Sequence, residues 1–372
     1  MLLNILRKKI YNRTRFARQT WEPKNKIYKS NIFNELSFQY RTYGKKNPKK
    51  NFFIIRRSPG AGFFSNLAFV IQNLHICDKL QMTPVIDMEN YQTYYNCKKK
   101  INNSLNSWDY YFKPVSNYKL SDVYQSKNVI ICDNKTSVGG YNKNNYKTNL
   151  RFFNGFQFFE NSHKKIINKY IKINKDIVLE ANNIQKKFKN YKVLGICFRG
   201  SDSKKNAYQP HTPTKNQMIY GTNLLLKKYK FDKIYLCTED SDYLNFYKKH
   251  YSKILIFNNN SPRTTDANDL FDSNNQIHRY LIGRGNLVDM LVLTKVNHIL
   301  FGVSNIPYTA LFFAKKKIPH TVIDNGMRGG VLKSIFSWRI KSILPDFMGG
   351  FKNNLITKEK IIKKRDSDFI II

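Results

Sequence analysis

The stretch KIYLCTEDSDYLNFYKKHYSKILIF, residues 233–257, contains the pattern that decides the fold. An apolar run at 233–238 is followed by an acidic turn and then by a segment with helical spacing at 240–250. A second apolar run, KILIF, occupies 253–257. Two short apolar runs joined by a helix form a β-α-β unit, in which the strands are parallel. The stretch therefore predicts a parallel sheet of the α/β class.

The same rhythm continues on both sides of this stretch. The expected strands are 193–198, 233–238, 253–257, 298–303 and 320–324, and the expected helices are 214–228, 240–250, 286–296 and 305–315. Five strands with four intervening helices predict a doubly wound sheet. Such sheets bind ligands at the carboxyl ends of their strands, which directs attention to the residues that follow each apolar run.

A second β-α-β unit is predicted near the start of the chain, with strands at 52–55 and 83–88. The helix between them has an apolar face formed by Leu67, Val70, Ile71, Leu74 and Cys77. We expect Ser65 or Asn66 to cap this helix. Gly60 and Gly62 form half of a dinucleotide fingerprint, but Ser65 replaces the third glycine, so we expect a turn that a ligand can approach rather than an NAD site. A strand near 128–132 and a helix around 160–187 complete this half.

The length of 372 residues is typical of two domains. We expect a basic N-terminal extension at 1–50, a Rossmann-like domain at 51–189, a second Rossmann-like domain at 190–345 and a basic C-terminal tail at 346–372. The predicted fold class is α/β, with two doubly wound domains.

Composition narrows the function classes. The net charge of +39 favours anionic partners, but the lysines are spread along the chain among many asparagines, and no nucleic-acid motif stands out. We expect no specific nucleic-acid partner. The five cysteines are scattered, which argues against a disulfide framework and a zinc site, and Cys197 and Cys237 are expected to be buried free thiols. With no long apolar run or secretory signal, a cytoplasmic protein is expected, with peripheral contact to the inner face of an anionic membrane.

Polar residues follow the strands of the second half. They are Arg199, Thr238, Glu239, Arg263, Ser304 and Asn305. Ser304 and Asn305 open a helix, and free N–H groups at a helix N-terminus bind anions. An arginine adds a permanently charged, bidentate contact to the same phosphate. This set suits a nucleoside diphosphate that leaves an activated sugar.

Structural roles compete with these functional ones. Arg199 can pair with Asp202, and Ser304 is simply a good helix cap. Asp240 and Asp242 form a DxD pattern, which holds a metal ion in another glycosyltransferase architecture. Asp240 is better explained as the cap of the helix that follows it.

Three segments resemble motifs of fucosyltransferases: LGICFRGSDSK (194–204), IYLCTEDSDYLNFY (234–247) and FGVSNIPYTALFF (301–313). Their order and spacing are similar to those of the superfamily that contains α-1,6-fucosyltransferases, the rhizobial nodulation fucosyltransferase and protein O-fucosyltransferases. SNLAFVIQNLHICDKLQMTPVIDM (65–88) is similar to the first helix and second strand of those enzymes. The resemblance covers roughly residues 52–90 and 190–325.

The resemblance implies a GT-B fold, in which the two doubly wound domains face a central cleft, with an acceptor domain at 51–189 and a nucleotide-sugar-binding domain at 190–345. It also implies a GDP-sugar donor such as GDP-fucose, inversion at the anomeric carbon, and no metal or other cofactor. Arg199 would contact the diphosphate and assist the departure of GDP, while Ser304 and Asn305 would bind phosphate. Asp289 would accept from guanine or ribose. The donor-binding set is completed by Gly60, Gly62, Asn66, His211, Thr238 and Arg263, and the catalytic set by Arg199, Asp202 and Glu239.

Two positions depart from the family pattern. Cys197 stands where a histidine is usual, and Ser201 replaces a common Arg or Thr. Guanine recognition must then differ or depend on other groups. The catalytic base also stays open between His211, Asp202 and Glu239.

The sequence thus predicts a glycosyltransferase that moves fucose from GDP-fucose to a glycan acceptor, such as a surface polysaccharide or a lipid-linked oligosaccharide. Two alternatives remain. One is a non-catalytic α/β protein that binds polyanions or nucleic acid, with affinity that falls steeply with salt. The other is a metal-dependent GT-A transferase that uses Asp240 and Asp242.

Overall fold

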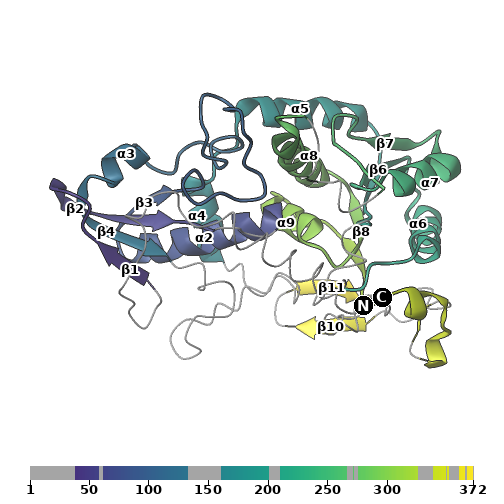
Figure 1. Cartoon of the computed structure of the whole chain (residues 1–372). Helices are drawn as coiled ribbons and strands as arrows, with labels where there is room; N and C mark the ends of the chain where they lie inside the picture. The colour runs from purple at the N-terminus through teal and green to yellow at the C-terminus, as the bar shows by residue number, and fades with distance from the viewer. Residues whose placement is uncertain are drawn as a thin grey trace, which may run out of the picture. The chain divides into compact units, whose positions relative to one another are not determined.

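The computed structural model describes residues 38–57, 62–132, 161–200, 210–265, 271, 275–325, 338–348, 350–351, 360–364 and 367–371. The chain forms two compact units (Figure 1). Unit 1 comprises Met1–Asn174 with Asn275–Gly283, and unit 2 comprises Lys175–Asn274 with Arg284–Ile372. The domain limits inferred from the sequence remain predictions, and Gly60 and Asp202 lie outside the described residues.

Unit 1 contains a four-stranded sheet with the strand order β1-β4-β2-β3. Its strands are β1 (Phe38–Arg41), β2 (Lys46–Ile55), β3 (Thr83–Ile86) and β4 (Ser126–Cys132). β2 pairs in parallel with both β3 and β4, which confirms the predicted β-α-β unit, and β1 adds an antiparallel edge. A short helix, α3 (Leu120–Val123), precedes β4.

Helix α2 (Phe63–Lys79) connects β2 to β3. All members of its predicted apolar face are buried, but its start differs from the prediction. Gly62, rather than Ser65 or Asn66, occupies the N-cap position. The helix begins early because Phe63 and Phe64 are buried in its first turn, where the Phe63 ring packs edge-on against Tyr95. The burial of these aromatic rings therefore determines where α2 starts, and it outweighs the preference of polar side chains for the N-cap position.

The single helix expected around 160–187 is instead two helices, α4 (Asn161–Tyr170) and α5 (Lys175–Gln185). The intervening residues pair with an earlier loop of unit 1. Lys113 N donates to Lys172 O at 2.7 Å, and Asn174 Nδ2 donates to Asp109 O at 3.0 Å. These contacts keep the residues between α4 and α5 out of the helical hydrogen-bonding pattern. They join residues far apart in the chain, so the spacing of apolar residues in the sequence does not reveal them.

Unit 2 contains a seven-stranded sheet with the order β10-β11-β9-β8-β5-β6-β7. The strands are β5 (Val193–Cys197), β6 (Lys233–Cys237), β7 (Leu255–Phe257), β8 (His298–Gly302), β9 (His320–Ile323), β10 (Lys360–Lys364) and β11 (Ser367–Ile371). The five strands predicted from the sequence are all present and parallel. The segment expected as a tail, 346–372, supplies β10 and β11.

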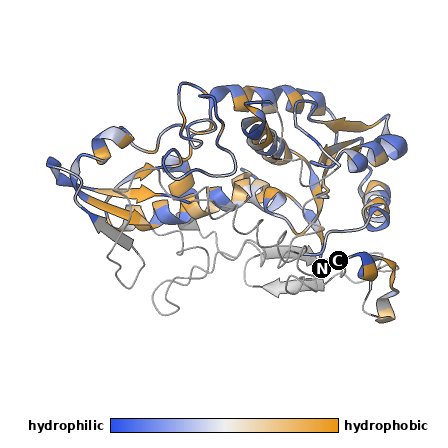
Figure 2. Cartoon of the chain, in the orientation of Figure 1, coloured by the Kyte–Doolittle hydropathy of each residue, from blue (hydrophilic) through white to orange (hydrophobic). Residues whose placement is uncertain are grey.

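Helices cover both faces of this sheet (Figure 1). α6 (Lys215–Tyr229) and α7 (Ser241–Tyr251) pack Met218 and Tyr247 against Ile196 of β5. α8 (His278–Leu293) packs on the opposite face, where a Cβ on Gly195 would lie 2.8 Å from a Leu293 methyl group. Glycine is therefore needed there for the close approach of the helix. Figure 2 shows the central strands as largely hydrophobic, as expected for strands buried on both faces.

Candidate functional site

The order of strands in unit 2 creates a topological switch point between β5 and β8. From β5 the chain proceeds through β6 and β7 in one direction, whereas β8 and β9 extend from the other side of β5. The carboxyl ends of β5 and β8 are therefore neighbours, and Cys197 Sγ lies 3.9 Å from Ser304 Oγ. Open α/β sheets bind ligands in the crevice at such a point. The segments that carry Arg199 and Ser304 meet there.

The strand β8 leads directly into α9 (Asn305–Phe313). Ser304 occupies the N-cap position with extended backbone, and its hydroxyl makes no capping hydrogen bond within the described part of the chain. Pro307 has no N–H, so the N–H groups of Asn305 and Ile306 are the first donors of the helix. The Asn305 Oδ1 atom is also buried and accepts no hydrogen bond from any described residue. This helix start has uncommitted polar groups that suit an anionic ligand.

Arg199 is held at the end of β5 by Glu239. Glu239 Oε1 accepts a hydrogen bond from Gly200 N at 3.0 Å and lies 3.9 Å from Arg199 Nε. The Arg199 side chain retains 33% exposure. A Cβ on Gly200 would lie 2.2 Å from Asp240 Oδ2, so glycine permits the turn to lie against the end of β6. Glu239 thus orients a partly exposed guanidinium at the switch point.

Thr238, Asp240 and Arg263 form a structural network beside this pair. The Arg263 guanidinium donates to the carbonyl oxygens of Thr238, Ser261 and Asn258 at 3.1, 3.0 and 2.8 Å, and so joins the loop after β7 to the end of β6. Asp240 Oδ1 accepts from the backbone N–H groups of Asp242 and Tyr243, which confirms its expected role as the cap of α7.

The two aspartates of the DxD pattern lie in different surroundings. Asp240, which caps α7, is buried, whereas Asp242 is exposed. Among the residues that the structure describes, no group of three or more His, Cys, Asp or Glu side chains is placed to hold a metal ion.

Asp289 lies below the strand ends on α8 and is 2% exposed. Tyr235 Oη donates to its Oδ1 atom at 2.6 Å, and burial raises the pKa of Asp289 to about 6. The expected contact with guanine or ribose remains a prediction, and it requires Tyr235 to move aside or the ligand to reach the second oxygen. Tyr235 was not among the predicted site residues, although its place in β6, alternating with Ile234 and Leu236, puts it on the α8 face.

His211 is buried rather than a surface residue. Its ring centroid lies 5.7 Å from that of Phe351. Two residues later, Pro213 packs closely on the end of β8. A Cβ on Gly302 would lie only 2.3 Å from Pro213 Cδ. The loop that carries His211 therefore crosses the strand ends of unit 2.

Cys197 and Cys237 are free and buried, as expected, and their sulfur atoms are 3.8 Å apart. The hydrogen bond with Cys197, together with burial, raises the pKa of the Cys237 thiol. Cys197, the member of this pair on β5, stands at the position where a histidine was expected from the family pattern.

Two predicted donor-binding residues belong to unit 1. Gly62 has no heavy atom within 4 Å of an added Cβ, so space beside it is open. Asn66 is buried and lines a small cavity of about 20 Å³ with Trp108 and Tyr111.

No protein-family model and no curated protein matches the sequence. Solved structures that are similar to this chain include fucosyltransferases. NodZ α-1,6-fucosyltransferase soaked with GDP-fucose has a TM-score of 0.43 and 15% identity, over 70% of this chain and 91% of that one. Fucosyltransferase NodZ from Bradyrhizobium has a TM-score of 0.40 and 14% identity, over 70% and 92%. POFUT1 in complex with GDP-fucose has a TM-score of 0.36 and 9% identity, over 75% and 99%.

The likeness is distant, so the activity of this chain is inferred from its own side chains.

Proposed function

We propose that this chain is an inverting glycosyltransferase that transfers fucose from GDP-fucose to a glycan acceptor and needs no metal ion or other cofactor. The observation that carries the proposal is the meeting of the Arg199 turn and the α9 N-terminus at the switch point of the sheet. A nucleoside diphosphate is bound well by a permanent positive charge together with directed N–H donors, and Arg199 and the start of α9 provide these two kinds of group.

In the proposed reaction, an acceptor hydroxyl oxygen bonds to the anomeric carbon as the bond from that carbon to the β-phosphate oxygen breaks. Negative charge grows on the departing GDP. Arg199 and the N–H groups of Asn305 and Ile306 stabilise that charge from fixed positions. The acceptor proton passes to a base. Because Glu239 already binds Gly200 N and orients Arg199, we assign it a positioning role and leave Asp202 and His211 as candidate bases.

Donor selection would rest on groups other than a histidine at position 197. The buried thiols of Cys197 and Cys237 offer no strong hydrogen bond to a guanine edge. Asp289, which the family resemblance assigns to guanine or ribose, acts electrostatically on the Cys237 thiol. We propose that it contributes to base recognition.

We further propose a cytoplasmic enzyme that touches an anionic membrane and acts on a surface polysaccharide or a lipid-linked oligosaccharide. Support comes from Ile340, Ile343, Phe347 and Met348, which are 48 to 88% exposed within one short segment. Arg339 and Lys341 alternate with them, and positive charges beside apolar groups favour anionic lipid surfaces. In the described part of the chain, no helix has the length and hydrophobicity of a transmembrane span.

Calorimetric titration with GDP, GDP-fucose and UDP-sugars, with and without EDTA, tests the proposal. We expect GDP to bind with micromolar affinity in EDTA, and Arg199→Ala to weaken binding ~10-fold or more, the loss of a charge-assisted contact. Lys249→Ala, which removes an exposed charge at the far end of α7, is the control and should leave GDP affinity unchanged.

Other outcomes point elsewhere. Binding that requires a metal ion and ignores Arg199 would favour the metal-dependent transferase. The absence of nucleotide binding, with affinity for polyanions that falls steeply in salt, would favour the non-catalytic alternative.

A further inference from the structure

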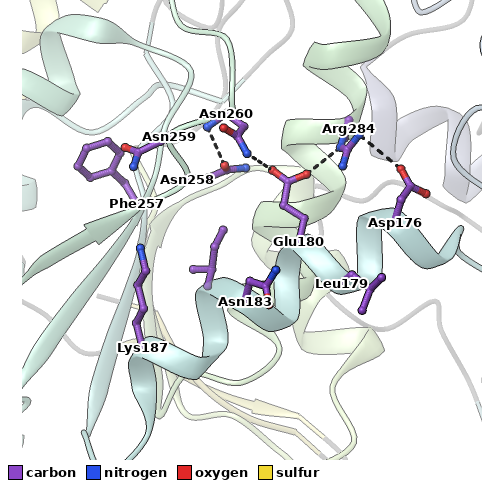
Figure 3. A pocket seen from close by; sticks show the side chains of 11 residues that line it. Asp176, Leu179, Glu180, Asn183, Lys187, Phe257, Asn258, Asn259, Asn260 and Arg284 are labelled. Atoms are coloured by element: carbon purple, nitrogen blue, oxygen red, sulfur yellow. Dashed lines mark hydrogen bonds and ion pairs between the residues drawn. The ribbon is translucent and has the colours of Figure 1, made fainter.

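A pocket of about 490 Å³ lies in unit 2, and none of the residues that line it is among those predicted to bind the donor (Figure 3). It is an open pocket bounded by α5, by the loop after β7 and by Arg284 of α8. Its lining residues are Asp176, Leu179, Glu180, Asn183, Ile184, Lys187, Phe257, Asn258, Asn259, Asn260 and Arg284. The volume is within the range of natural small-molecule sites.

One wall of the pocket is a continuous chain of polar contacts around Glu180. Its Oε2 atom accepts from Arg284 Nε at 2.7 Å, and its Oε1 atom accepts from Asn260 Nδ2 at 3.0 Å. Arg284 Nη1 also lies 3.4 Å from Asp176 Oδ2. Figure 3 shows Glu180 between Asn260 and Arg284. Both oxygens of this carboxylate are engaged, so the wall is ordered by the protein itself.

The loop that forms the opposite rim is fixed as well. Arg263 binds the carbonyl oxygens of Asn258 and Ser261, and Asn260 N donates to Asn258 Oδ1 at 3.0 Å. A Cβ on Gly285 would lie 2.4 Å from Ser261 Oγ, so glycine allows α8 to lie directly against this loop. The pocket is thus formed before any ligand enters, which lowers the entropic cost of binding.

The charges of the lining balance. Asp176 and Glu180 are opposed by Arg284 and Lys187, so the pocket has no net charge and does not favour an ionic ligand. Carboxamides of Asn183 and Asn259, both exposed, each present a donor and an acceptor. Hydroxyl groups, which also donate and accept, match such a rim.

The pocket also offers apolar surface. Leu179 is 60% exposed at the lining, although leucine on a surface helix is more often turned inward, and Ile184 lies one turn further along α5. Phe257 also lines the pocket, and Lys248 Nζ and Arg263 Cζ lie 4.9 and 5.4 Å from its ring centroid. A ligand with hydroxyl edges and an apolar face satisfies both kinds of lining, and sugar rings have this character.

We propose that this pocket binds a neutral glycan of one or two sugar units and holds the acceptor or product chain at a second site on unit 2. The ligand class follows from the lining, whereas the acceptor role rests on the proposed glycosyltransferase function. Such a site would retain a growing polysaccharide between rounds of transfer, because a second contact raises the effective concentration of the chain at the enzyme.

The full-length protein should be screened on an array of neutral and anionic oligosaccharides, and glycans that bind should then be titrated by calorimetry. We expect neutral glycans to bind. Leu179→Trp, which fills the pocket mouth, should weaken binding ~10-fold or more, and Asn183→Ala should weaken it ~3- to 10-fold, the loss of one or two hydrogen bonds. Asn182→Ala is the matched control, since Asn182 is exposed on the same helix but does not line the pocket.

The same variants should be titrated with GDP. Loss of glycan binding with unchanged GDP affinity supports a separate site. Glycan binding in a chain that does not bind GDP would support the pocket and reject the proposed function. The inference is overturned if no neutral glycan binds, if only anionic glycans bind, or if Asn182→Ala and Asn183→Ala have equal effects.

Discussion

Cys197 Sγ and Ser304 Oγ lie 3.9 Å apart although 107 residues separate them in the sequence. This contact brings the end of β5 next to the end of β8, where the Arg199 turn and the start of α9 follow. The contact exists because β8 pairs with β5 rather than with β7, so that the winding of the sheet reverses at this point. The candidate donor site depends on that reversal.

Two glycines provide a matched test of the turn after β5. We expect Gly200→Ala to lower stability by about 1 kcal/mol or more, because the new Cβ would displace the Asp240 carboxylate that caps α7. Gly62→Ala introduces no such clash, because no heavy atom lies within 4 Å of its added Cβ, and it should cost only about 0.5 kcal/mol, the effect of replacing glycine by alanine at the N-cap of α2. Urea unfolding and GDP titration of both variants check this. Equal destabilisation would show that the close approach of Gly200 to Asp240 is unimportant.

The Arg199–Glu239 pair makes a kinetic prediction. In Glu239→Gln the amide oxygen can still accept from Gly200 N, but the charge that orients Arg199 is lost. Release of GDP from GDP-fucose should slow about 10-fold, while GDP affinity stays equal or rises because a nearby negative charge has gone. Arg199→Lys keeps a charge but loses the planar fork, and both rate and affinity should fall. A parallel loss of rate and affinity in Glu239→Gln would argue against a positioning role.

Asp289 should make the folded state less stable as pH rises. Burial raises its pKa to about 6 in the folded chain, above the ordinary value of 3.8, so the unfolded chain releases the proton first. The folded state therefore loses up to about 3 kcal/mol between pH 4 and pH 6 on account of this group. Asp289→Asn lacks this titration. The stability of the variant relative to that of the parent should therefore be higher at pH 8 than at pH 4. Urea unfolding of parent and variant at the two pH values measures the difference, and a constant difference would contradict it.

His298 should act in the opposite direction. Burial, with the nearby His320 and Lys228, lowers the pKa of His298 to about 4, and its Nε2 atom lies 2.9 Å from Thr321 Oγ1. Between pH 6.5 and 4 the unfolded chain binds a proton that the folded chain excludes, so stability falls as the pH is lowered. His298→Gln should unfold with a weaker dependence on pH over this interval. An unchanged slope would indicate that His298 does not titrate on unfolding.

The exposed segment 338–348 predicts lipid binding. In sedimentation with vesicles of phosphatidylcholine alone or mixed with phosphatidylglycerol, the chain should bind only the anionic vesicles. The double variant Ile343→Ser with Phe347→Ser should lose most of this binding. Ile343 is 66% exposed and Phe347 is 88% exposed, so both side chains can enter the lipid surface. Leu80→Ser, at a residue that is 49% exposed in another part of the chain, serves as the control. If the double variant binds anionic vesicles as well as the parent does, lysines elsewhere in the chain are responsible for the binding.

Local sequence determined much of this protein. The apolar runs and helical spacing placed all five parallel strands of unit 2, because the burial of short strands on both faces and the amphipathic periodicity of helices are local properties. Asp240 was identified as a helix cap for the same reason: its partners are two and three residues away. Residue types at the strand ends indicated an anion site before the order of strands was known.

Only tertiary structure decided which strand ends meet. Strand pairing between β5 and β8, the partner of Arg199, the burial of Asp289 against Tyr235 and the early start of α2 all depend on contacts between residues far apart in the chain. The same holds for the pocket around Glu180, whose wall joins α5, the loop after β7 and α8. Such contacts are selected by packing and by the desolvation of polar groups, and these are properties of the assembled sheet and helices rather than of any single segment.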